Sequence, residues 1–454
     1  MSINKSIISE AILHANDDAN RTVDVRAGVL SLHYYEDIFS PTITAKMQIV
    51  NAGGAISPRD SRRVDKQSIY NGLPLRGGEK FDLKVAGNSN KNPGLDFSTT
   101  ETTLYVSSIT DVMASDDKET FTLHLVSKEA IANEVVRVKR RYSGNILDSI
   151  KLILENVLKT TNFDISKFDK VSNSYDFIGN MRKPFYTLVW LASKCVPTIA
   201  NETAGFVFYQ TRDGFQFKSI DNLIKKKSKA TYTYTEGIQS YDDNDKKVDN
   251  DRKILNYTID RNQNLVEKLR FGTFSSERHF FNPHTFTFSS NDTFGENRYK
   301  NKVKSLGSDL NIPKIEGLDL DLGKVPSRII SGVFDTGAVT GKEVPKDGDK
   351  PDASYKNADA TKYQSQSIMR YNTLFLQTLS VTVPSNTNLR AGDIIECLFP
   401  VVSESKSKEF DDETSGLYMI KELCHYFDVN GSYTSMKLVR DTHGINIEEP
   451  DDND

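Results

Sequence analysis

The residues that could do chemistry are few, and their spacing does not form a familiar site. His279 and His284 are five positions apart in ERHFFNPHTF, with no acid between them and with Pro283 interrupting any helix. A zinc-binding H-E-x-x-H pair needs two histidines one helical turn apart, with a glutamate beside the first. We therefore expect a strand or loop surface here, and no metal site.

The chain has three cysteines, Cys195, Cys397 and Cys424, and no C-x-x-C pair. This number is too small for a disulfide framework and indicates a reducing compartment. Cys397 and Cys424 lie in strands of one predicted barrel and can be neighbours, although buried free thiols are the commoner arrangement. His425 follows Cys424 directly, so in a strand its side chain points to the opposite face. We predict no catalytic Cys–His pair.

Two further patterns resemble sites without their spacing. GKEVPKDGDK, residues 341–350, lacks the G-x-x-x-x-G-K-[ST] order that cradles phosphate, and is predicted to be a linker. The acidic pairs Asp242–Asp243 and Asp411–Asp412 lie in polar loops, where solvated turns far outnumber glycosidase carboxylate pairs. The sequence therefore predicts no catalytic, cofactor-binding or metal-binding residues, and a protein that is not an enzyme.

Charge gives no general attraction to nucleic acid or to an anionic membrane, because 58 basic and 62 acidic residues leave a net charge of −4. Basic residues cluster in VKRR, residues 138–141, and KKKSK, residues 225–229. Such runs usually lie in solvent, and the alternative is contact with a protein partner. Trp190, the single tryptophan, lies next to the apolar face of a predicted helix and is expected to anchor a core.

The 454 residues are enough for two to four domains. The 19 Tyr and 24 Phe, with abundant Thr and Ser, favour a strand-rich fold. The first residues lack the apolar core of a signal peptide, and no run approaches 18 apolar residues. We expect a chain that is neither exported by this route nor inserted into a membrane.

Alternation of apolar and polar residues predicts strands in the first 130 residues. In TITAKMQIV, residues 42–50, every second residue is apolar, which is the period of a half-buried strand. Similar segments follow at 80–86, 103–110 and 119–126, separated by residues that form tight turns. We expect a barrel or sandwich, interrupted by a polar loop with a short helix at 59–72.

The period then changes to that of a helix. NILDSIKLILENVL, residues 145–158, carries one broad apolar stripe, and KPFYTLVWLASKCVP, residues 183–197, has Pro184 in its first turn and Pro197 as its stop. Strand-like GFVFYQ and GFQFKSI follow. Residues 131–225 are therefore predicted to form a mixed α/β domain.

The second half returns to strands after a long interruption. Hydrophobicity falls between residues 307 and 361, which predicts a long flexible loop near 335–362, and EEPDDND at 448–454 is an acidic tail. We expect a helix over 359–372 and strand-like segments at residues 230–237, 264–276, 376–384, 392–400 and 417–441.

One hairpin pattern occurs twice. LYVSSITDVMASDDKETFTLHLVSK begins at Leu104, and LYMIKELCHYFDVNGSYTSMKLVRD begins at Leu417. Before each comes a glycine, an acid and an alternating strand, with Glu79 in the first copy and Asp393 in the second. Two unrelated hairpins with polar turns would share this layout, and a duplicated barrel is the other explanation. Duplication would let three chains present six similar barrels around one axis.

These patterns predict a β-rich, multidomain α+β fold with two similar antiparallel tube-type β-barrels and a mixed α/β domain. The expected boundaries are 1–130 for the first barrel, 131–225 for the α/β domain, and 226–275 with 373–447 for a split second barrel. Residues 276–372 are expected to be an insertion that contributes to the outer α/β part.

The sequence resembles the central baseplate hub proteins of contractile-tailed bacteriophages of the T-even type. The resemblance covers both ends and the first half, and residues 280–365 match poorly. The phrases that carry it are YYEDIFSPTITAKMQIVN (34–51), LRGGEKFDLKV (75–85), LHLVSKEAIANE (123–134), RKPFYTLVWLASKCV (182–196), GDIIECLFP (392–400), SGLYMIKELCHYF (415–427) and MKLVRDTHG (436–444).

The resemblance implies a homotrimer whose barrels form a pseudo-hexameric ring between the sixfold tail tube and the threefold cell-puncturing spike. It implies the tube protein, the trimeric spike protein and other baseplate proteins as partners, no cofactor, and a place in the virion tail after assembly in the host cytoplasm. DNA would pass through the ring without specific binding, so we expect a lumen poor in Lys and Arg.

Two other functions stay open. A cell-wall or polysaccharide hydrolase of a phage tail would need two carboxylates in distinct environments, or a metal cluster. A glycan-binding adhesin would display aromatic side chains on exposed loops.

Overall fold

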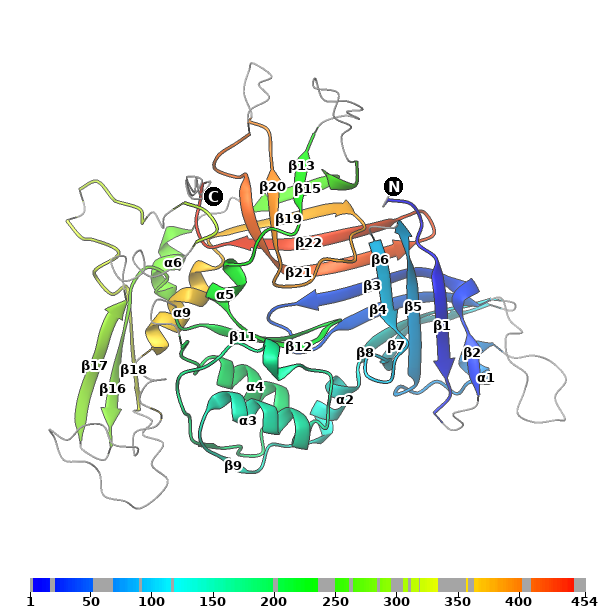
Figure 1. The fold of residues 1–454 in the computed structure, drawn as a ribbon, viewed down its shortest axis with the longest axis horizontal. Helices are drawn as coiled ribbons and strands as arrows, with labels where there is room; N and C mark the ends of the chain where they lie inside the picture. The colour runs from blue at the N-terminus through cyan, green and yellow to red at the C-terminus, as the bar shows by residue number, and fades with distance from the viewer. Residues whose placement is uncertain are drawn as a thin grey trace.

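The chain folds as a β-rich α+β protein in which two sets of strands are joined edge to edge (Figure 1). Among the described residues, no helix combines the length and the apolar character that a bilayer crossing requires. The computed structural model describes residues 3–16, 21–51, 68–89, 92–115, 118–198, 203–235, 250–260, 264–283, 286–294, 305–308, 312–317, 319–333, 357, 363–401 and 410–444.

The first strand set comes from the N-terminal part of the chain and has the strand order β2-β1-β5-β7-β8-β4-β3, with β6 paired to β5. Alternate residues of each strand enter one apolar core, as the period of two requires. The predicted strands are confirmed here. The bounds are β1 Ile8–His14, β2 Thr22–Asp24, β3 Val29–Asp37, β4 Thr44–Asn51, α1 Ile69–Gly72, β5 Lys80–Ser89, β6 Asn92–Phe97, β7 Leu104–Ala114 and β8 Glu119–Ser127.

The second strand set is assembled from two stretches of chain and has the order β14-β13-β20-β21-β22-β19-β15. Its apolar core is separate from that of the first set. The bounds are β13 Thr231–Tyr234, β14 Lys253–Ile254, β15 Asn256–Asp260, β19 Gln377–Pro384, β20 Ile394–Leu398, β21 Gly416–Asp428 and β22 Ser432–Arg440.

Five strands of each set have the same order and the same antiparallel sense. They are β5-β7-β8-β4-β3 in the first set and β20-β21-β22-β19-β15 in the second. The register irregularity between Val106 and Ser108 in β7 has its counterpart between Ile420 and Glu422 in β21. A bulge inserts one residue and bends the strand, so this agreement extends the likeness from topology to backbone shape.

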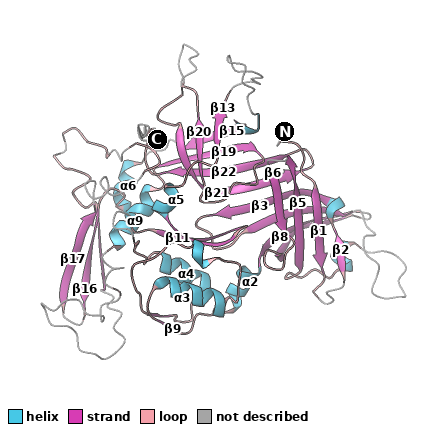
Figure 2. Cartoon of the chain, in the orientation of Figure 1, coloured by secondary structure: helices cyan, strands magenta, loops and turns pink. Residues whose placement is uncertain are grey.

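A third apolar core is formed by the chain between the first strand set and the second, below β11 in Figure 2. Its helices begin as their sequence predicts, because the Asn145 side chain caps α3 by accepting from Leu147 N, and Pro184 opens α4. The bounds are α2 Lys128–Val135, β9 Arg141–Tyr142, α3 Ile146–Leu152 with a π-helical turn Ile153–Val157, β10 Phe177–Ile178, α4 Pro184–Ala192, β11 Phe206–Thr211, β12 Gly214–Ser219 and α5 Ile220–Ile224.

An outer part stands apart from these layers and carries a small sheet in the order β17-β16-β18 (Figure 1). Helix α9 begins at Gln364, later than predicted, and the loop predicted near 335–362 and the tail at 448–454 fall outside the described residues apart from Asn357. The bounds are α6 Leu265–Phe271, β16 Ser276–Asn282, β17 Thr287–Phe294, β18 Arg328–Val333 and α9 Gln364–Thr373.

The prediction of a strand over residues 264–276 is wrong, because Leu265–Phe271 is helix α6. Asn264 caps it by accepting from Glu267 N, and Gly272 ends it with a φ of 70°. An Asn followed three residues later by Glu, with Gly at the end, is the signature of a short helix. The capping residues at both ends favour a helix here, although the apolar residues between them are also compatible with a strand.

Candidate assembly site

The first strand set opens its central hairpin with an acidic turn, Arg76-Gly77-Gly78-Glu79. Gly78 has a φ of 90°, a conformation that residues with a Cβ rarely adopt. The buried Glu79 carboxylate accepts from Arg76 N at 2.7 Å and so closes the turn. Gly78 N donates to Val106 O and Val106 N donates to Glu79 O, which fixes the turn on β7.

The second strand set repeats this turn with Arg390-Ala391-Gly392-Asp393. Gly392 has a φ of 82°, and the buried Asp393 carboxylate accepts from Arg390 N at 2.8 Å. Gly392 N donates to Ile420 O and Ile420 N donates to Asp393 O. The same three hydrogen bonds therefore occur in both sets, and they identify Val106 with Ile420.

This correspondence corrects the alignment read from the sequence. If Val106 matches Ile420, then Leu104 matches Tyr418, and both of these side chains point into their cores. The shared Leu-Tyr at the start of the two hairpins is one residue out of register, which in a strand exchanges the two faces. In the closing strands of the two hairpins Leu125 corresponds to Leu438, because these residues pair with Val106 and Ile420.

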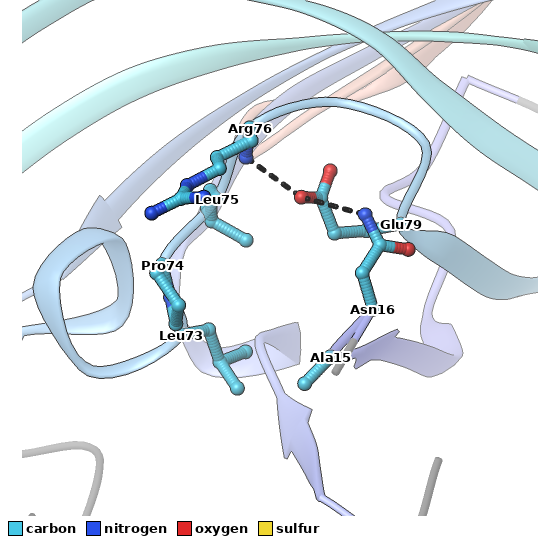
Figure 3. A pocket seen from close by; sticks show the side chains of 7 residues that line it. All are labelled: Ala15, Asn16, Leu73, Pro74, Leu75, Arg76 and Glu79. Carbon is cyan, nitrogen blue, oxygen red and sulfur yellow. Dashed lines mark hydrogen bonds between the residues drawn. The ribbon is translucent and has the colours of Figure 1, made fainter. Parts of the chain in front are cut away.

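The two acids differ in what surrounds them. Glu79 lines a pocket of about 270 Å³ between residues 15–16 and 73–76, and Asn16 Nδ2 lies 3.3 Å from its carboxylate (Figure 3). Asp393 instead has Lys229 Nζ at 2.6 Å and Lys226 Nζ at 3.7 Å. One acid is held by neutral donors and the other by cations.

The two strand sets meet where β3 pairs with β21. The pairing is antiparallel and runs from Glu422 opposite Asp37 to Asp428 opposite Ser31. Lys421 Nζ lies 2.7 Å from an Asp37 carboxylate oxygen at one end of this junction. Continuous main-chain hydrogen bonding therefore joins the sets within one chain.

Glu36 is the polar centre of the junction and is buried. Its carboxylate accepts from Tyr34 Oη at 2.8 Å, Arg212 N at 2.9 Å and Ala391 N at 3.0 Å. These donors come from the first strand set, the β11–β12 turn and the second strand set. Burial raises the pKa of the Glu36 carboxyl, and the nearby Arg390 guanidinium opposes the rise. One carboxylate thus holds three parts of the chain together.

Arg390 crosses the same junction. Its Nε donates to Asp213 Oδ2 at 2.8 Å, and its Nη1 donates to the carbonyl oxygens of Thr387 and Leu389. The guanidinium fork lets one side chain bind a carboxylate and main-chain oxygens at once. This arrangement positions the second acidic turn against β11 and β12.

His425 is buried in β21 beside this cluster, and its Nδ1 lies 3.0 Å from Thr434 Oγ1. Burial lowers the pKa of His425 to about 3, and the positive charges of Arg390 and Arg212 act in the same direction. The imidazole is therefore neutral at physiological pH and packs parallel to the Tyr34 ring.

The predicted reactive residues do not form a site in the described part of the chain. His279 lies in β16 and its ring is 3.8 Å from Glu277, while His284 and the 341–350 segment fall outside the described residues. Where residues are described, no group of three or more metal-ligating side chains gathers. Asp411 accepts from Glu413 N and Thr414 Oγ1, as in an ordinary turn, and the Asp242–Asp243 pair falls outside.

The cysteine prediction needs a correction. Cys397 lies opposite Gly416 at the start of β21, whereas Cys424 lies opposite Ser435 and Tyr35. Eight residues of strand separate the two positions, roughly 26 Å at about 3.3 Å per residue, so the thiols are not neighbours. All three cysteines are free, and burial raises the pKa of the Cys424 thiol to about 11.

Two other expectations have clear outcomes. Trp190 packs edge-on against Tyr175 and Phe177, so its role as a core anchor is confirmed. The KKKSK run is not a solvated face throughout, because Lys226 and Lys229 bind Asp393 of the same chain.

Sequence reasoning did not find Glu36, Arg212 or Arg390. The contacts that join these residues to other parts of the chain are distant in sequence, and Ala391 is 355 positions from Glu36. The only local signal is an acid at an inward-facing position two residues after Tyr34 in a strand.

The sequence matches no protein-family model and no curated protein. Among solved structures, it is similar to the tail protein from Neisseria meningitidis MC58, with 12% identity over 95% of this chain and 96% of that chain and a TM-score of 0.50. The 43 kDa tail protein of prophage MuSo2 from Shewanella oneidensis has 11% identity, 95% and 98% coverage and a TM-score of 0.47. The E. coli c3393 protein, a component of the type VI secretion system, has 8% identity, 93% and 77% coverage and a TM-score of 0.40.

The likeness to the Neisseria meningitidis protein extends over nearly the whole of both chains, so it describes the complete fold and not one shared motif. This chain therefore has the same overall fold as that tail protein, in line with the resemblance seen in its sequence.

Proposed function

We propose that this chain is the structural hub of a phage tail baseplate and that it works as a homotrimeric ring without catalysing a reaction. The observation that carries the proposal is the repetition within one chain. Five strands in the same order, the same acidic turn and the same bulge occur twice, and the copies are joined through β3 and β21.

Repetition has a use in a ring. Three chains with two similar strand sets each place six such sets around one axis, while the rest of the chain keeps threefold symmetry. A ring of this kind can contact a sixfold tail tube on one face and a threefold spike on the other. A trimer with one strand set per chain offers only three equivalent contacts.

The proposal assigns the two strand sets to two tube-type β-barrels, at 1–130 and at 226–275 with 373–447. Residues 131–225 and the insertion at 276–372 then form the outer part. Other baseplate proteins would contact this outer part, in the tail of a virion assembled in the host cytoplasm.

The mass of the purified protein is the first test. Three chains of 51.1 kDa each give a particle of about 153 kDa, which light scattering or mass photometry resolves from the monomer. Electron microscopy of that particle should show a ring, with subunit interfaces larger than the roughly 1,600 Å² of a standard complex. A chain that stays monomeric in the presence of the tube and spike proteins contradicts the proposal.

The ring must let DNA pass, so its lumen should be poor in Lys and Arg, because a basic lining would hold phosphates. The assembled ring should not retain duplex DNA at moderate salt in a filter-binding assay. Retention that falls steeply with salt would contradict this part of the proposal.

The alternative function is a hydrolase of cell wall or polysaccharide. A turnover assay on peptidoglycan and capsule separates it from the hub. We expect no release of soluble fragments, and release that is lost on substitution of a carboxylate would establish the alternative.

A further inference from the structure

The long strand of each set is covered differently along its second half. In β21, residues 422–427 pair with β22 on one side and with β3 on the other. In β7, the residues from Ser108 onward pair with β8, and β5 reaches only Leu104 and Tyr105. Within the described residues, the second half of β7 therefore has a strand on one side only.

The last strand of each set shows the complementary difference. β3 pairs with β4 on one side and with β21 on the other. Its counterpart β15 pairs with β19, and the described part of the chain supplies no strand on its other side. The junction between β21 of the second set and β3 of the first is filled, whereas the corresponding edges, β7 of the first set and β15 of the second, are open within the described residues.

Side-chain burial also differs between β3, which has a strand on both sides, and β15, which has a described strand on one side. Leu32 and Tyr34 of β3 are fully buried, whereas their counterparts Tyr257 and Ile259 in β15 are only partly buried against the second core. The β15 side chains are therefore apolar, like those of β3 at the filled junction, but no described strand covers them.

The difference in side-chain burial is larger between the long strands β21 and β7. Phe427 of β21 is 3% exposed, and Met113, in the corresponding part of β7, is 70% exposed. Val112 beside it is 44% exposed. An exposed strand edge with apolar side chains is a template for pairing with another chain, and soluble proteins usually block such edges.

We propose that β7 of one copy of this chain pairs antiparallel with β15 of the next copy and repeats the β21–β3 junction between subunits. The proposal rests on the trimeric ring of the proposed function and names the strands that close it. Each chain then has one internal junction and contributes one half to each of two external ones. Such a head-to-tail contact closes into a ring when successive rotations are alike, and repetition within the chain makes them alike.

The internal junction also fixes the register. Tyr426 lies opposite His33 in the β21–β3 pairing. The corresponding residues are Val112 in β7 and Thr258 in β15, and the irregularity of β7 between Thr110 and Met113 shifts this pair by at most one position. Val112 of one subunit should therefore face Thr258 of the next.

Disulfide trapping tests this pair. Directly opposed strand residues have Cα atoms about 4.5–5.5 Å apart, which is within disulfide range. The double variant Val112→Cys/Thr258→Cys should form interchain disulfides under mild oxidation, with a covalent trimer as the largest closed species on a non-reducing gel. Each single variant should give no such ladder, which also controls for Cys424.

Two matched variants control geometry. His33→Cys/Tyr426→Cys places cysteines at the same positions of the internal junction and should form an intrachain bond without a change in mass. Val112→Cys/Asn256→Cys is two residues out of register on β15 and should cross-link at least tenfold less than the Thr258 pair.

The outcomes separate this inference from the hub function. A ring of the expected mass that shows no Val112–Thr258 link, while the His33–Tyr426 link forms, overturns the strand pairing and leaves the hub standing. A monomer that shows neither mass increase nor cross-link at any protein concentration overturns both. A trimeric ladder that depends on both cysteines establishes the pairing.

Discussion

The two strand sets have the same backbone plan and different edges. In the second set the long strand β21 is covered by β3, and in the first set the corresponding strand β7 ends with Met113 exposed. β7 has a second irregularity, between Thr110 and Met113, that β21 lacks. The main difference comes from position in the chain, since a single polypeptide can fill only one of the two junctions that its repeats define.

The two acidic turns also share their backbone geometry and differ in the charges around them. The backbone of both turns is held by one buried carboxylate that accepts from the amide three residues earlier. Around it, the first set supplies Asn16 and the second supplies Lys226 and Lys229. The turn geometry is therefore kept while its electrostatic surroundings change.

The largest expected effect comes from breaking the filled junction. Glu36→Ala leaves buried donors from Tyr34, Arg212 and Ala391 without their acceptor and removes the counter-charge of Arg390. We expect a loss of about 3–5 kcal/mol in the free energy of unfolding, measured by denaturant titration. Asp37→Ala, at the neighbouring partly exposed position, should cost at most about 1 kcal/mol. Equal losses would show that burial at the junction is not the cause.

Lowering the pH should reduce the free energy of unfolding through His425, which belongs to the second strand set. The pKa of His425 is about 3 in the folded chain and 6.5 in the unfolded chain, so between these values the unfolded state binds the extra proton. The free energy of unfolding should fall by up to about 1.4 kcal/mol for each pH unit below 6.5.

The raised pKa of Glu36 gives a slope of the opposite sign above 4.5, so the comparison must be with His425→Gln. This variant should lose the part of the slope due to the imidazole, measured by thermal unfolding at several pH values between 5 and 7. A slope identical to that of the unmodified chain would mean that His425 takes up its proton without unfolding.

The acidic turns should respond to salt differently. Glu79→Ala and Asp393→Ala each remove the acceptor of a backbone amide, and each should cost about 1–3 kcal/mol. Part of the Asp393 contribution is ionic, so its cost should shrink in 1 M salt, where charges are screened over about 3 Å. The cost of Glu79→Ala should change little. The opposite salt dependence would contradict the assignment of neutral and charged surroundings.

The smallest effect on unfolding should come from the open edge. Met113→Lys places a charge on an exposed strand, so the free energy of unfolding of the isolated chain should change by at most about 0.5 kcal/mol. Assembly should nevertheless fail, because a charge at a strand edge opposes pairing. Sedimentation of the variant should show a folded monomer. Leu30→Lys, at another exposed apolar position, should still assemble.

Local patterns predicted much of the fold. The period of two located β4, β5, β7 and β8, and helical spacing with Pro184 located α3 and α4. Prediction failed at α6, where short-range capping outweighed apolar alternation, and at the start of the repeat, where a shared Leu-Tyr concealed a slip of one residue. Sequence identity cannot detect such a slip, because it does not say which face of a strand a residue occupies.

The sequence alone determined which segments become strands and helices and that one hairpin occurs twice, because these properties depend on residues close together in the chain. Tertiary structure alone decided that Glu36 and Ala391 meet, that Asp393 is paired with lysines, and that one junction is filled while its counterpart is open within the described residues. The reason is that these contacts join residues at least 164 positions apart, and only the packing of complete strand sets brings such residues together.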